Sequence, residues 1–345
     1  MSRPVLLMPG PMTEHVIEAC GAHFEIVKLW ESNDPMETLG LRGATVAAIA
    51  TAGSPAVDAE LMRHLPNLEI IAGFGVGYDS IDVAEAARRG IVVTNTPDVL
   101  TDDVADVAIG LLLMAVREMP QAERHLRDGR WRDGPYRLAP TRLRGRKLGI
   151  LGLGRIGEAI ARRAEPFGVE ISYHNRQPKA VPYRYCDTLA ELADRVDTLV
   201  IATPGGPATR HLVDADILRR LGPQGVIVNV ARGSVIDEGA LVDALRSGTI
   251  LSAGLDVYED EPYVPDELLE LPNVVLLPHI GSATMQTRRA MGELVVDNLV
   301  SWFANGTALT PVPETRQPES GQTSRGLTRR RRDVRTSDKG KRCAS

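Results

Sequence analysis

The sequence predicts an α/β protein with two doubly wound, Rossmann-like parallel sheets and a cleft between them. Short apolar runs of β type alternate with helical patterns almost throughout the chain, which is typical of a parallel sheet covered by helices. The strands are continuous apolar runs rather than in-out alternations, as expected when both faces of a sheet are buried. The alternation occurs twice, and a long helix separates the two series. We expect a ligand between the sheets, because the carboxyl ends of parallel strands form binding crevices.

The first series occupies the first third of the chain. Its expected strands cover residues 5–8, 24–29, 46–51, 68–73 and 91–94. Helical patterns connect these strands, for example at 58–64 and 83–89. A long helix then follows at 102–117, and because it is apolar on most sides we expect it to cross from one domain to the other.

The second series begins at Lys147. Its expected strands cover residues 148–151, 169–173, 198–202, 226–230, 251–257 and 274–277. A final helical pattern runs from about 285 to 304. With 345 residues, of which 43% are apolar and 25% charged, the chain is long enough and ordinary enough in composition for two globular domains.

Location is predicted from the apolar runs and the cysteines. No apolar run approaches the roughly 20 residues of a membrane span, and the strand pattern begins at Pro4, so we expect neither a membrane segment nor a signal peptide. Cys20, Cys186 and Cys343 lack paired spacing, which favours a reducing cytoplasm and indicates neither disulfides nor a zinc site.

Charge is distributed unevenly along the chain. Residues 313–345 hold ten Arg or Lys against four Asp or Glu, a net of +6, which leaves −11 on the rest of a chain whose total is −5. An acidic body argues against a nucleic-acid partner. The basic segment, with four arginines in succession at 329–332, is polar enough that we predict a disordered tail. The alternative is a tail that contacts RNA or an anionic surface.

The strand at 148–151 leads into a glycine-rich turn. Gly152, Gly154 and Gly157 stand in G-x-G-x-x-G order, and a helical pattern follows. The first glycine of a dinucleotide-binding turn allows the tight bend, the second lets the backbone approach a pyrophosphate, and the third lets helix and strand pack closely. The pyrophosphate then binds at the positive end of the helix. The alternative is a plain βα turn with incidental glycines.

The end of the next strand indicates which dinucleotide binds. An NAD site normally places Asp or Glu about 20 residues after the first glycine, where it binds the ribose hydroxyls. Here the strand ends in His174, Asn175 and Arg176, without a carboxylate. Asn175 and Arg176 suit a 2′-phosphate, so we predict that NADP(H) is preferred and that NAD(H) is possible. The alternative is that Arg176 is a solvent-facing loop residue.

Three polar residues follow the later strands of the second series. Arg232 follows the strand at 226–230, Glu261 lies in the loop after Asp256, and His279 follows the strand at 274–277. Reduction of a keto acid needs a cation for the carboxylate and keto oxygen, an acid for the proton, and a carboxylate that orients the imidazole. Taken singly, each has a structural alternative: an ion pair, a solvated loop carboxylate and a hydrogen-bonded core histidine.

These motifs resemble the D-isomer-specific 2-hydroxyacid dehydrogenase family, especially its glyoxylate/hydroxypyruvate reductase branch. The resemblance covers about residues 3 to 312. The glycine turn is one matching segment, and the others are 73–82, 95–101, 228–233, 254–262 and 277–281. Their order and the spacings of 29 residues from Arg232 to Glu261 and 18 from Glu261 to His279 agree with the family.

The resemblance implies roles for individual residues. Arg232 binds substrate, Glu261 pairs with the imidazole, and His279 is the acid/base. The loop Gly75-Val76-Gly77 offers its N–H groups to the substrate carboxylate, although a tight βα turn explains the same glycines. Asp256 holds the nicotinamide carboxamide. The remaining residues placed beside the cofactor are Thr101, Arg155, Ile156, Thr203, Pro204, Val230, Ala231, His279, Gly281 and Ser282.

The resemblance also implies a domain division and a dimer. Residues 1–98 with 286–312 form a discontinuous, flavodoxin-like substrate domain, and 99–285 form the Rossmann domain. Family members are usually homodimers, joined through the cofactor domain by helices that correspond to 102–117 and its neighbours. No metal is implied.

Two other readings stay open. The family includes transcriptional corepressors that keep the dehydrogenase fold but act as cofactor-sensing binding proteins. The intact trio of Arg232, Glu261 and His279 argues against this, because a sensor does not need it. The substrate is expected to be glyoxylate or hydroxypyruvate, with an aromatic, phosphorylated or sugar-derived 2-keto acid as the alternative. Pocket width depends on positions such as Ala52, Phe74 and Tyr136.

Overall fold

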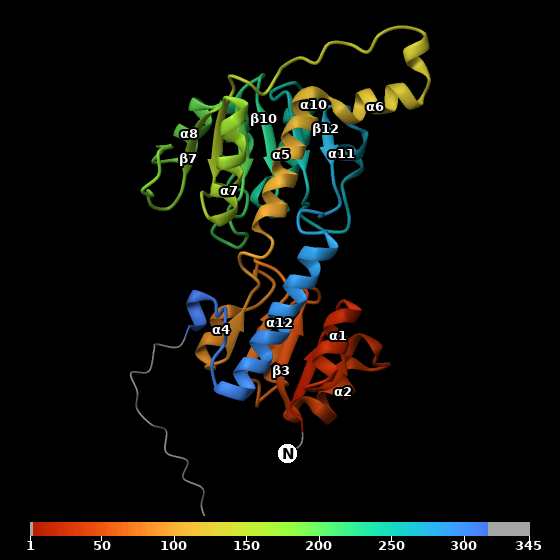
Figure 1. The fold of residues 1–345 in the computed structure, drawn as a ribbon, viewed down its shortest axis with the longest axis vertical. Helices are drawn as coiled ribbons and strands as arrows, with labels where there is room; N and C mark the ends of the chain where they lie inside the picture. The colour runs from red at the N-terminus through yellow and green to blue at the C-terminus, as the bar shows by residue number, and fades with distance from the viewer. Residues whose placement is uncertain (1–2, 317–345) are drawn as a thin grey trace, which may run out of the picture.

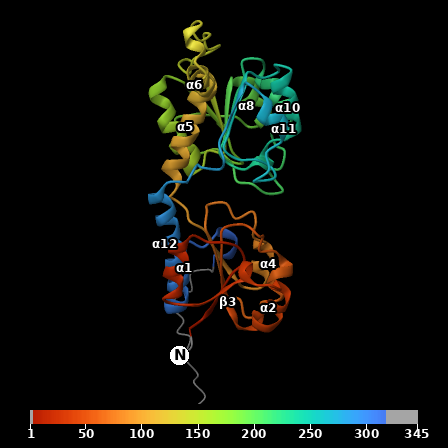
Figure 2. The same ribbon diagram turned by 90° about the vertical axis from the view of Figure 1, so that its right-hand side faces the viewer.

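The computed structural model describes residues 3–316 and confirms the predicted fold class. Two parallel sheets lie one above the other along the long axis of the molecule, each covered by helices (Figure 1). Turning the molecule by 90° shows helices on both sides of each sheet (Figure 2). Every strand pair in both sheets is parallel.

The first sheet has five strands in the order β2-β1-β3-β4-β5, which is the flavodoxin-like order. Its strands are β1 (Val5–Met8), β2 (Glu25–Lys28), β3 (Val46–Thr51), β4 (Ile70–Gly73) and β5 (Val92–Thr94). Its helices are α1 (Glu14–Gly21), α2 (Pro35–Arg42), α3 (Ala59–Arg63) and α4 (Val83–Arg88). The last helix, α12 (Met285–Asn305), returns to this sheet, where Val295, Val296 and Leu299 join a core cluster with residues of β1, β3 and β4.

The second sheet has seven strands in the order β12-β11-β10-β9-β6-β7-β8. Its strands are β6 (Lys147–Leu151), β7 (Glu170–His174), β8 (Arg184–Tyr185), β9 (Thr198–Ile201), β10 (Val226–Asn229), β11 (Ser252–Leu255) and β12 (Val274–Leu276). The long helix α5 (Thr101–Arg117) and α7 (Arg155–Ala164) share one core cluster with residues of this sheet. The other helices are α8 (Leu189–Arg195), α9 (Ala215–Leu221), α10 (Glu238–Arg246) and α11 (Asp266–Glu270). Strands β7 and β8 are added on one side of β6 and strands β9 to β12 on the other, so the strand order reverses at β6. Such sheets bind dinucleotides at the point of reversal.

Local sequence explains where most helices begin. Asp34, Asp58, Asp82, Thr188, Asp214, Asp237 and Thr284 each accept a hydrogen bond from a backbone N–H of the helix that follows. Such caps satisfy N–H groups that the first turn leaves free. By contrast, Gly154 precedes α7 and no side chain caps that helix. The first turn of α7 is therefore open to a ligand.

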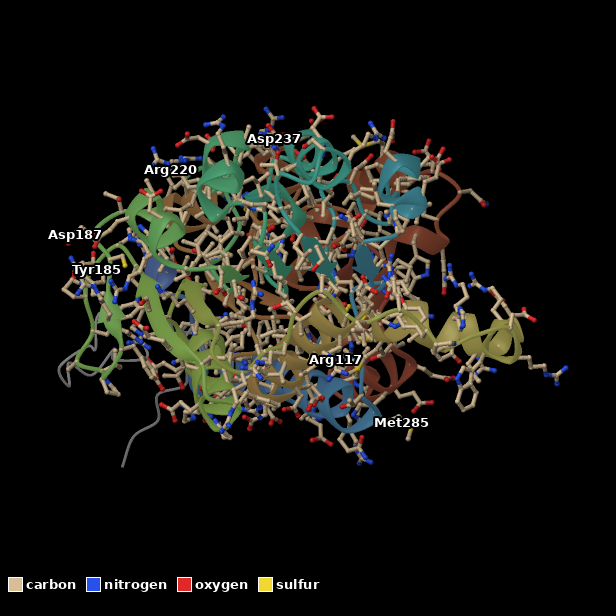
Figure 3. All side chains as sticks on the ribbon, turned by 90° about the horizontal axis from the view of Figure 1, so that it is seen from above. Arg117, Tyr185, Asp187, Arg220, Asp237 and Met285 are labelled. Carbon is tan, nitrogen blue, oxygen red and sulfur yellow. The ribbon has the colours of Figure 1, made fainter. Side chains whose placement is uncertain are left out.

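An arm projects from the second sheet. Helix α6 (Met119–Arg127) and the irregular chain up to β6 extend away from the body (Figure 1). Seen along the long axis, the side chains of α6 stand clear of the remaining helices (Figure 3). None of the residues of α6 is buried. The apolar periodicity of the sequence did not predict this helix, because it has no core-facing side.

The ordered chain continues beyond Val312, where we expected the tail to begin. A 3-10 turn, η6 (Pro313–Thr315), follows it. The Thr315 hydroxyl accepts the N–H of Val93 at 2.9 Å, and the Thr315 side chain is buried against β5. Residues 313–315, which the sequence assigned to the tail, therefore form a turn whose Thr315 hydroxyl completes the hydrogen bonding of β5. The predicted disorder of the rest of the segment lies outside the described residues.

Candidate active site

His279 and Glu261 form the closest polar contact of the candidate site. His279 follows β12 and Glu261 follows β11, two strands that are neighbours in the sheet. His279 Nδ1 lies 2.6 Å from Glu261 Oε2, and the other oxygen of Glu261 accepts the N–H of Tyr258 at 3.0 Å. Because Nδ1 is held by the carboxylate, Nε2 is the ring nitrogen that remains for a ligand.

The surroundings of Glu261 keep its carboxyl group charged. Burial raises its pKa, but the hydrogen bond and charge of His279, the N–H of Tyr258 and the charge of Arg232 together hold the pKa below its ordinary value. The structure thus brings together two predicted residues, His279 and Glu261. A charged carboxylate beside the ring suits a histidine that acts as an acid, because it stabilises the imidazolium.

The loop that carries His279 is fixed by Asp256. The carboxylate of Asp256 accepts the N–H of Ile280 at 2.7 Å and that of Gly281 at 2.8 Å, and its carbonyl accepts the N–H of His279. Burial raises the pKa of Asp256, while the two N–H groups oppose that effect. A β-carbon on Gly281 would lie 2.9 Å from Oδ2 of Asp256. The sequence interpretation gave Asp256 only a cofactor role and missed this structural one.

Arg232 reaches from the second sheet to the first. Its Nε donates to Asp79 at 3.0 Å and its Nη1 donates to the carbonyl of Ala231 at 2.7 Å. A β-carbon built on Gly77 would lie 1.6 Å from Nη2. Gly77 therefore lacks a side chain because the guanidinium occupies that space, which supports a site function for the loop Gly75-Val76-Gly77. Of the three guanidinium nitrogens of Arg232, Nη2 is the one that makes no hydrogen bond within residues 3–316.

Asp79 is a site residue that the sequence interpretation did not identify. Its partner lies 153 positions away in the chain, on the other sheet. The available signal was a carboxylate two residues after Gly77, in a loop that follows a parallel strand. That signal does not reveal the partner, because it is a contact between sheets.

The glycine-rich turn has the geometry that its sequence predicts. Gly152 has a φ of +95°, and a β-carbon there would lie 2.6 Å from the backbone nitrogen of Thr203. A β-carbon on Gly157 would lie 2.3 Å from the carbonyl oxygen of Gly152. A β-carbon on Gly154 would meet nothing within 4 Å. The first and third glycines are therefore required by packing, while the second faces open space at the uncapped end of α7, where a pyrophosphate fits.

The end of β7 differs from the expectation in one respect. The Asn175 side chain accepts the N–H of Leu153 at 2.7 Å, so it ties β7 to the glycine turn. Arg176 is exposed and follows directly. No Asp or Glu stands at the end of β7. Arg176 thus becomes the main candidate for a 2′-phosphate, and Asn175 shapes the turn.

The other predicted residues lie after strands of the second sheet or at the start of α5 or α7. Thr101 begins α5, and Ile156 packs on the core from the first turn of α7. Val230 and Ala231 are buried between β10 and Arg232, and Ser282 is buried after Gly281. Thr203 is half-buried and Pro204 exposed after β9. Arg155 pairs with Asp98 at 2.8 Å, a contact across the segment that joins the two sheets.

The candidate site coincides neither with a large surface hollow nor with a metal-binding cluster of the described residues. Two hollows of about 400 and 720 Å³ lie on the outer surface, and none of the predicted site residues lines either. Within residues 3–316, no group of three or more His, Cys, Asp or Glu is arranged to hold a metal ion. In the same part of the chain, no helix combines the length and apolar character that crossing a membrane requires.

The chain is similar to known proteins along most of its length. A family model described as D-isomer specific 2-hydroxyacid dehydrogenase, NAD binding domain, matches residues 109–281. Glyoxylate/hydroxypyruvate reductase A of Arabidopsis thaliana is 45% identical over 308 residues, which cover 89% of this chain and 98% of that protein. Hydroxyphenylpyruvate reductase of Plectranthus scutellarioides is 43% identical, with the same coverage of both chains.

A solved structure agrees with the same relationship. It is the NADPH-dependent glyoxylate/hydroxypyruvate reductase of Sinorhizobium meliloti, in complex with NADP and malonate. It is 53% identical in sequence to this chain, with a TM-score of 0.85, and the match covers 91% of this chain and 98% of that one.

Proposed function

The chain belongs to the D-isomer-specific 2-hydroxyacid dehydrogenase family, in its glyoxylate/hydroxypyruvate reductase branch, and on that premise we propose that it reduces a small 2-keto acid to the D-2-hydroxy acid. Glyoxylate and hydroxypyruvate are the proposed substrates. The observation that carries the proposal is the pairing of His279 with Glu261 at the carboxyl ends of the strands, where the charge of Arg232 also acts on Glu261. The relatives' activities support it.

His279 supplies the proton. With Nδ1 held by the Glu261 carboxylate, the protonated imidazole presents Nε2–H to the keto oxygen. Loss of that proton to the substrate leaves a neutral imidazole, and the next proton comes from solvent. Glu261 is a positioning residue, because it contacts the imidazole and orients it.

Arg232 holds the substrate together with the loop from the first sheet. Asp79 and the Ala231 carbonyl occupy Nε and Nη1, so Nη2 is directed at the Gly77 backbone. A carboxylate bound between the loop N–H groups and Nη2 places its neighbouring keto carbon toward His279. The positive charge of Arg232 also polarises the keto oxygen.

The residues of the glycine turn suit a nicotinamide dinucleotide. Gly152, Gly154 and Gly157 with the first turn of α7 would hold the pyrophosphate, and the segments after β9, β10 and β12 would line the rest of the dinucleotide. When bound, the reduced cofactor supplies the hydride. NADP(H) is preferred, with NAD(H) possible, because Arg176 is exposed and β7 ends without a carboxylate. The NADP complex of the Sinorhizobium meliloti relative supports this preference.

The proposed architecture has a substrate domain of residues 1–98 and 286–312, extended by η6, and a cofactor domain of 99–285. The chain is proposed to act as a homodimer in the cytoplasm. The arm supports the dimer, because it exposes apolar side chains, namely Met119 at 44%, Leu126 at 55%, Trp131 at 66% and Leu138 at 93%. Sedimentation of the purified chain tests the dimer.

A panel assay tests the function. The purified chain is mixed with NADPH or NADH and with glyoxylate, hydroxypyruvate or hydroxyphenylpyruvate, and cofactor oxidation is followed. Turnover with one of the first two substrates supports the proposal. Hydroxyphenylpyruvate is included because a relative of similar identity carries that activity in its name. Cofactor binding without turnover on any keto acid would favour the sensor alternative.

A further inference from the structure

Glu238 is a half-buried carboxylate that the proposed mechanism does not use. It is the first residue of α10. Its Oε1 accepts the backbone N–H of Glu259 at 2.8 Å, across 21 positions of the chain. The side chain of Glu238 therefore binds the loop after β11, which also carries Glu261, rather than its own helix.

The neighbouring carboxylate, Asp237, has an ordinary structural role. Its side chain accepts the N–H of Ala240 at 3.0 Å and so caps α10. Within residues 3–316, the Asp237 side chain makes no hydrogen bond to the loop after β11. Because Asp237 already caps the helix, the start of α10 does not need Glu238 as an acceptor.

Gly233 fixes the same peptide from another side. A β-carbon on Gly233 would lie 1.8 Å from the carbonyl carbon of Tyr258 and 2.2 Å from the nitrogen of Glu259. The peptide between Tyr258 and Glu259 thus lies directly on the α-carbon of Gly233. The short segment 233–238 therefore contacts this peptide with both of its ends, by packing at Gly233 and by a hydrogen bond at Glu238.

This peptide is connected to the candidate acid. The N–H of Tyr258 donates to Oε1 of Glu261 at 3.0 Å, and Oε2 of Glu261 lies 2.6 Å from Nδ1 of His279. The hydroxyl of Tyr258 donates to the carbonyl of Leu277 at 2.9 Å, just before His279 in the chain. A shift of Tyr258 would therefore disturb both the Glu261 carboxylate and the segment that carries His279.

The charges around Glu238 do not favour a carboxylate. Burial raises the pKa of Glu238, the N–H of Glu259 opposes that effect, and the charges of Glu259, Asp260 and Glu261 raise the pKa further. The Glu259 carboxylate is itself paired with Arg210 and His211. Residues that break a local rule of this kind concentrate at functional sites. The hydrogen bond to the loop is the interaction that offsets the unfavourable charges.

We propose that Glu238 is a positioning residue, whose side-chain oxygen holds the Tyr258–Glu259 peptide so that Glu261 stays in contact with His279. This inference rests on the proposed function, in which His279 is the acid. The role depends on the reach of the acceptor and not on its charge, because the donor is a backbone N–H. Without the acceptor, this N–H lacks a partner within residues 3–316, and the loop moves to where water satisfies it. Glu261 then leaves the imidazole, and His279 holds its proton less strongly.

Three variants of Glu238 separate reach from charge. Glu238→Gln keeps the reach and an amide oxygen but removes the charge. Glu238→Asp keeps the charge but shortens the side chain by one methylene, and Glu238→Ala removes both. With NADPH and the faster of glyoxylate and hydroxypyruvate, kcat should fall roughly 10-fold in Glu238→Ala, as for the loss of one hydrogen bond, and less in Glu238→Asp. Glu238→Gln should recover most of the loss.

Asp237→Ala is the matched control, because it removes the helix cap beside Glu238 but leaves the contact with the loop. It should melt at a lower temperature than the wild type and keep the wild-type kcat. An equal fall of kcat in Asp237→Ala and Glu238→Ala would show that Glu238 only stabilises the fold. Full activity in Glu238→Asp with a loss in Glu238→Gln would assign the effect to charge and overturn the inference.

The pH dependence of the rate is a readout that a merely structural role would not move. Reduction slows as the pH rises, because the imidazole loses the proton that it must donate. In Glu238→Ala this loss of rate should occur about one pH unit lower than in the wild type, and Glu238→Gln should restore the wild-type position. An unchanged pH profile in Glu238→Ala would contradict the role of Glu238.

NMR of the histidine rings keeps the inference testable if the wild type reduces no keto acid, an outcome that contradicts the proposed function alone. The chain is labelled with isotopic histidine, and His279→Ala identifies the signals of His279. The midpoint of the His279 titration should be lower in Glu238→Ala than in the wild type and unchanged in Asp237→Ala. If Glu238→Ala does not fold, Glu238→Asp replaces it in this comparison. Equal midpoints in the wild type and the Glu238 variant would refute the inference, whether or not the chain is an enzyme.

Discussion

Gly77 and Arg232 fit each other across the two sheets: a β-carbon on Gly77 would lie 1.6 Å from Nη2 of Arg232. The loop after β4 and the arginine after β10 therefore lie against each other, although 155 positions separate Gly77 from Arg232 in the chain. Asp79 strengthens that fit by accepting Nε of the same guanidinium at 3.0 Å. The candidate site is thus built from both sheets.

Gly77→Ala should damage catalysis more than stability. The added methyl group displaces the guanidinium of Arg232, and a displacement of about 1 Å at a reacting centre can reduce the rate roughly 100-fold. Steady-state kinetics with the preferred keto acid measure the loss in kcat/KM. Gly40→Ala is the control, because a β-carbon there meets nothing within 4 Å. Wild-type kinetics in Gly77→Ala would show that Arg232 can move away without consequence.

Glu261→Gln should change how stability depends on pH. Burial raises the pKa of Glu261, but the hydrogen bond and the charge of His279 lower it more, so the pKa lies below its ordinary value of 4.5. The charged carboxylate therefore stabilises the folded state above that pH. The stabilisation is lost as the pH falls through the lowered pKa. Urea unfolding should therefore separate wild type from variant at neutral pH, and the gap should shrink below about pH 4.5. A gap that is constant with pH would contradict this interpretation.

A chain that ends at Arg316 should retain wild-type stability and activity, because residues 317–345 are too polar to contribute a core. A chain that ends at Val312 should be less stable by about 1–3 kcal/mol, since the N–H of Val93 then loses the Thr315 hydroxyl. Thermal unfolding of the two truncated chains compares them. Equal melting temperatures would mean that η6 does not stabilise β5.

Arg176→Ala should reduce the preference for NADPH over NADH. A charge-assisted hydrogen bond to the 2′-phosphate contributes roughly 1.5–3 kcal/mol, or about 10- to 150-fold in affinity. Screening by salt reduces that value at an exposed site such as Arg176. The kcat/KM for NADPH should fall while that for NADH changes little. A wild-type enzyme that already prefers NADH would refute the NADP assignment and leave the reductase assignment intact.

Much of this fold was predictable because the signals are local. Buried parallel strands read as apolar runs, and the glycine turn combines tight local geometry with a following helix. The positions of Arg232, Glu261 and His279 were predictable for a similar reason, since each follows a parallel strand and such ends share one edge.

The features that escaped prediction depend on contacts that the sequence does not display. Asp79 acquires its role from a residue on the other sheet, and Thr315 from β5, 222 positions earlier. Glu238 stands out by its hydrogen bond to the backbone of Glu259, which only coordinates reveal. Strand β8 has two residues and helix α6 has no buried side, so neither has an apolar pattern to detect.

The most direct measurement is the rate of NADPH oxidation by the purified chain with glyoxylate or hydroxypyruvate, compared between wild type and His279→Ala. Because the proton comes from His279, the variant should lose roughly 10²- to 10⁴-fold in kcat while binding NADPH with nearly unchanged affinity. Wild-type turnover in His279→Ala, or an inactive wild type that still binds NADPH, would contradict the proposed reductase mechanism.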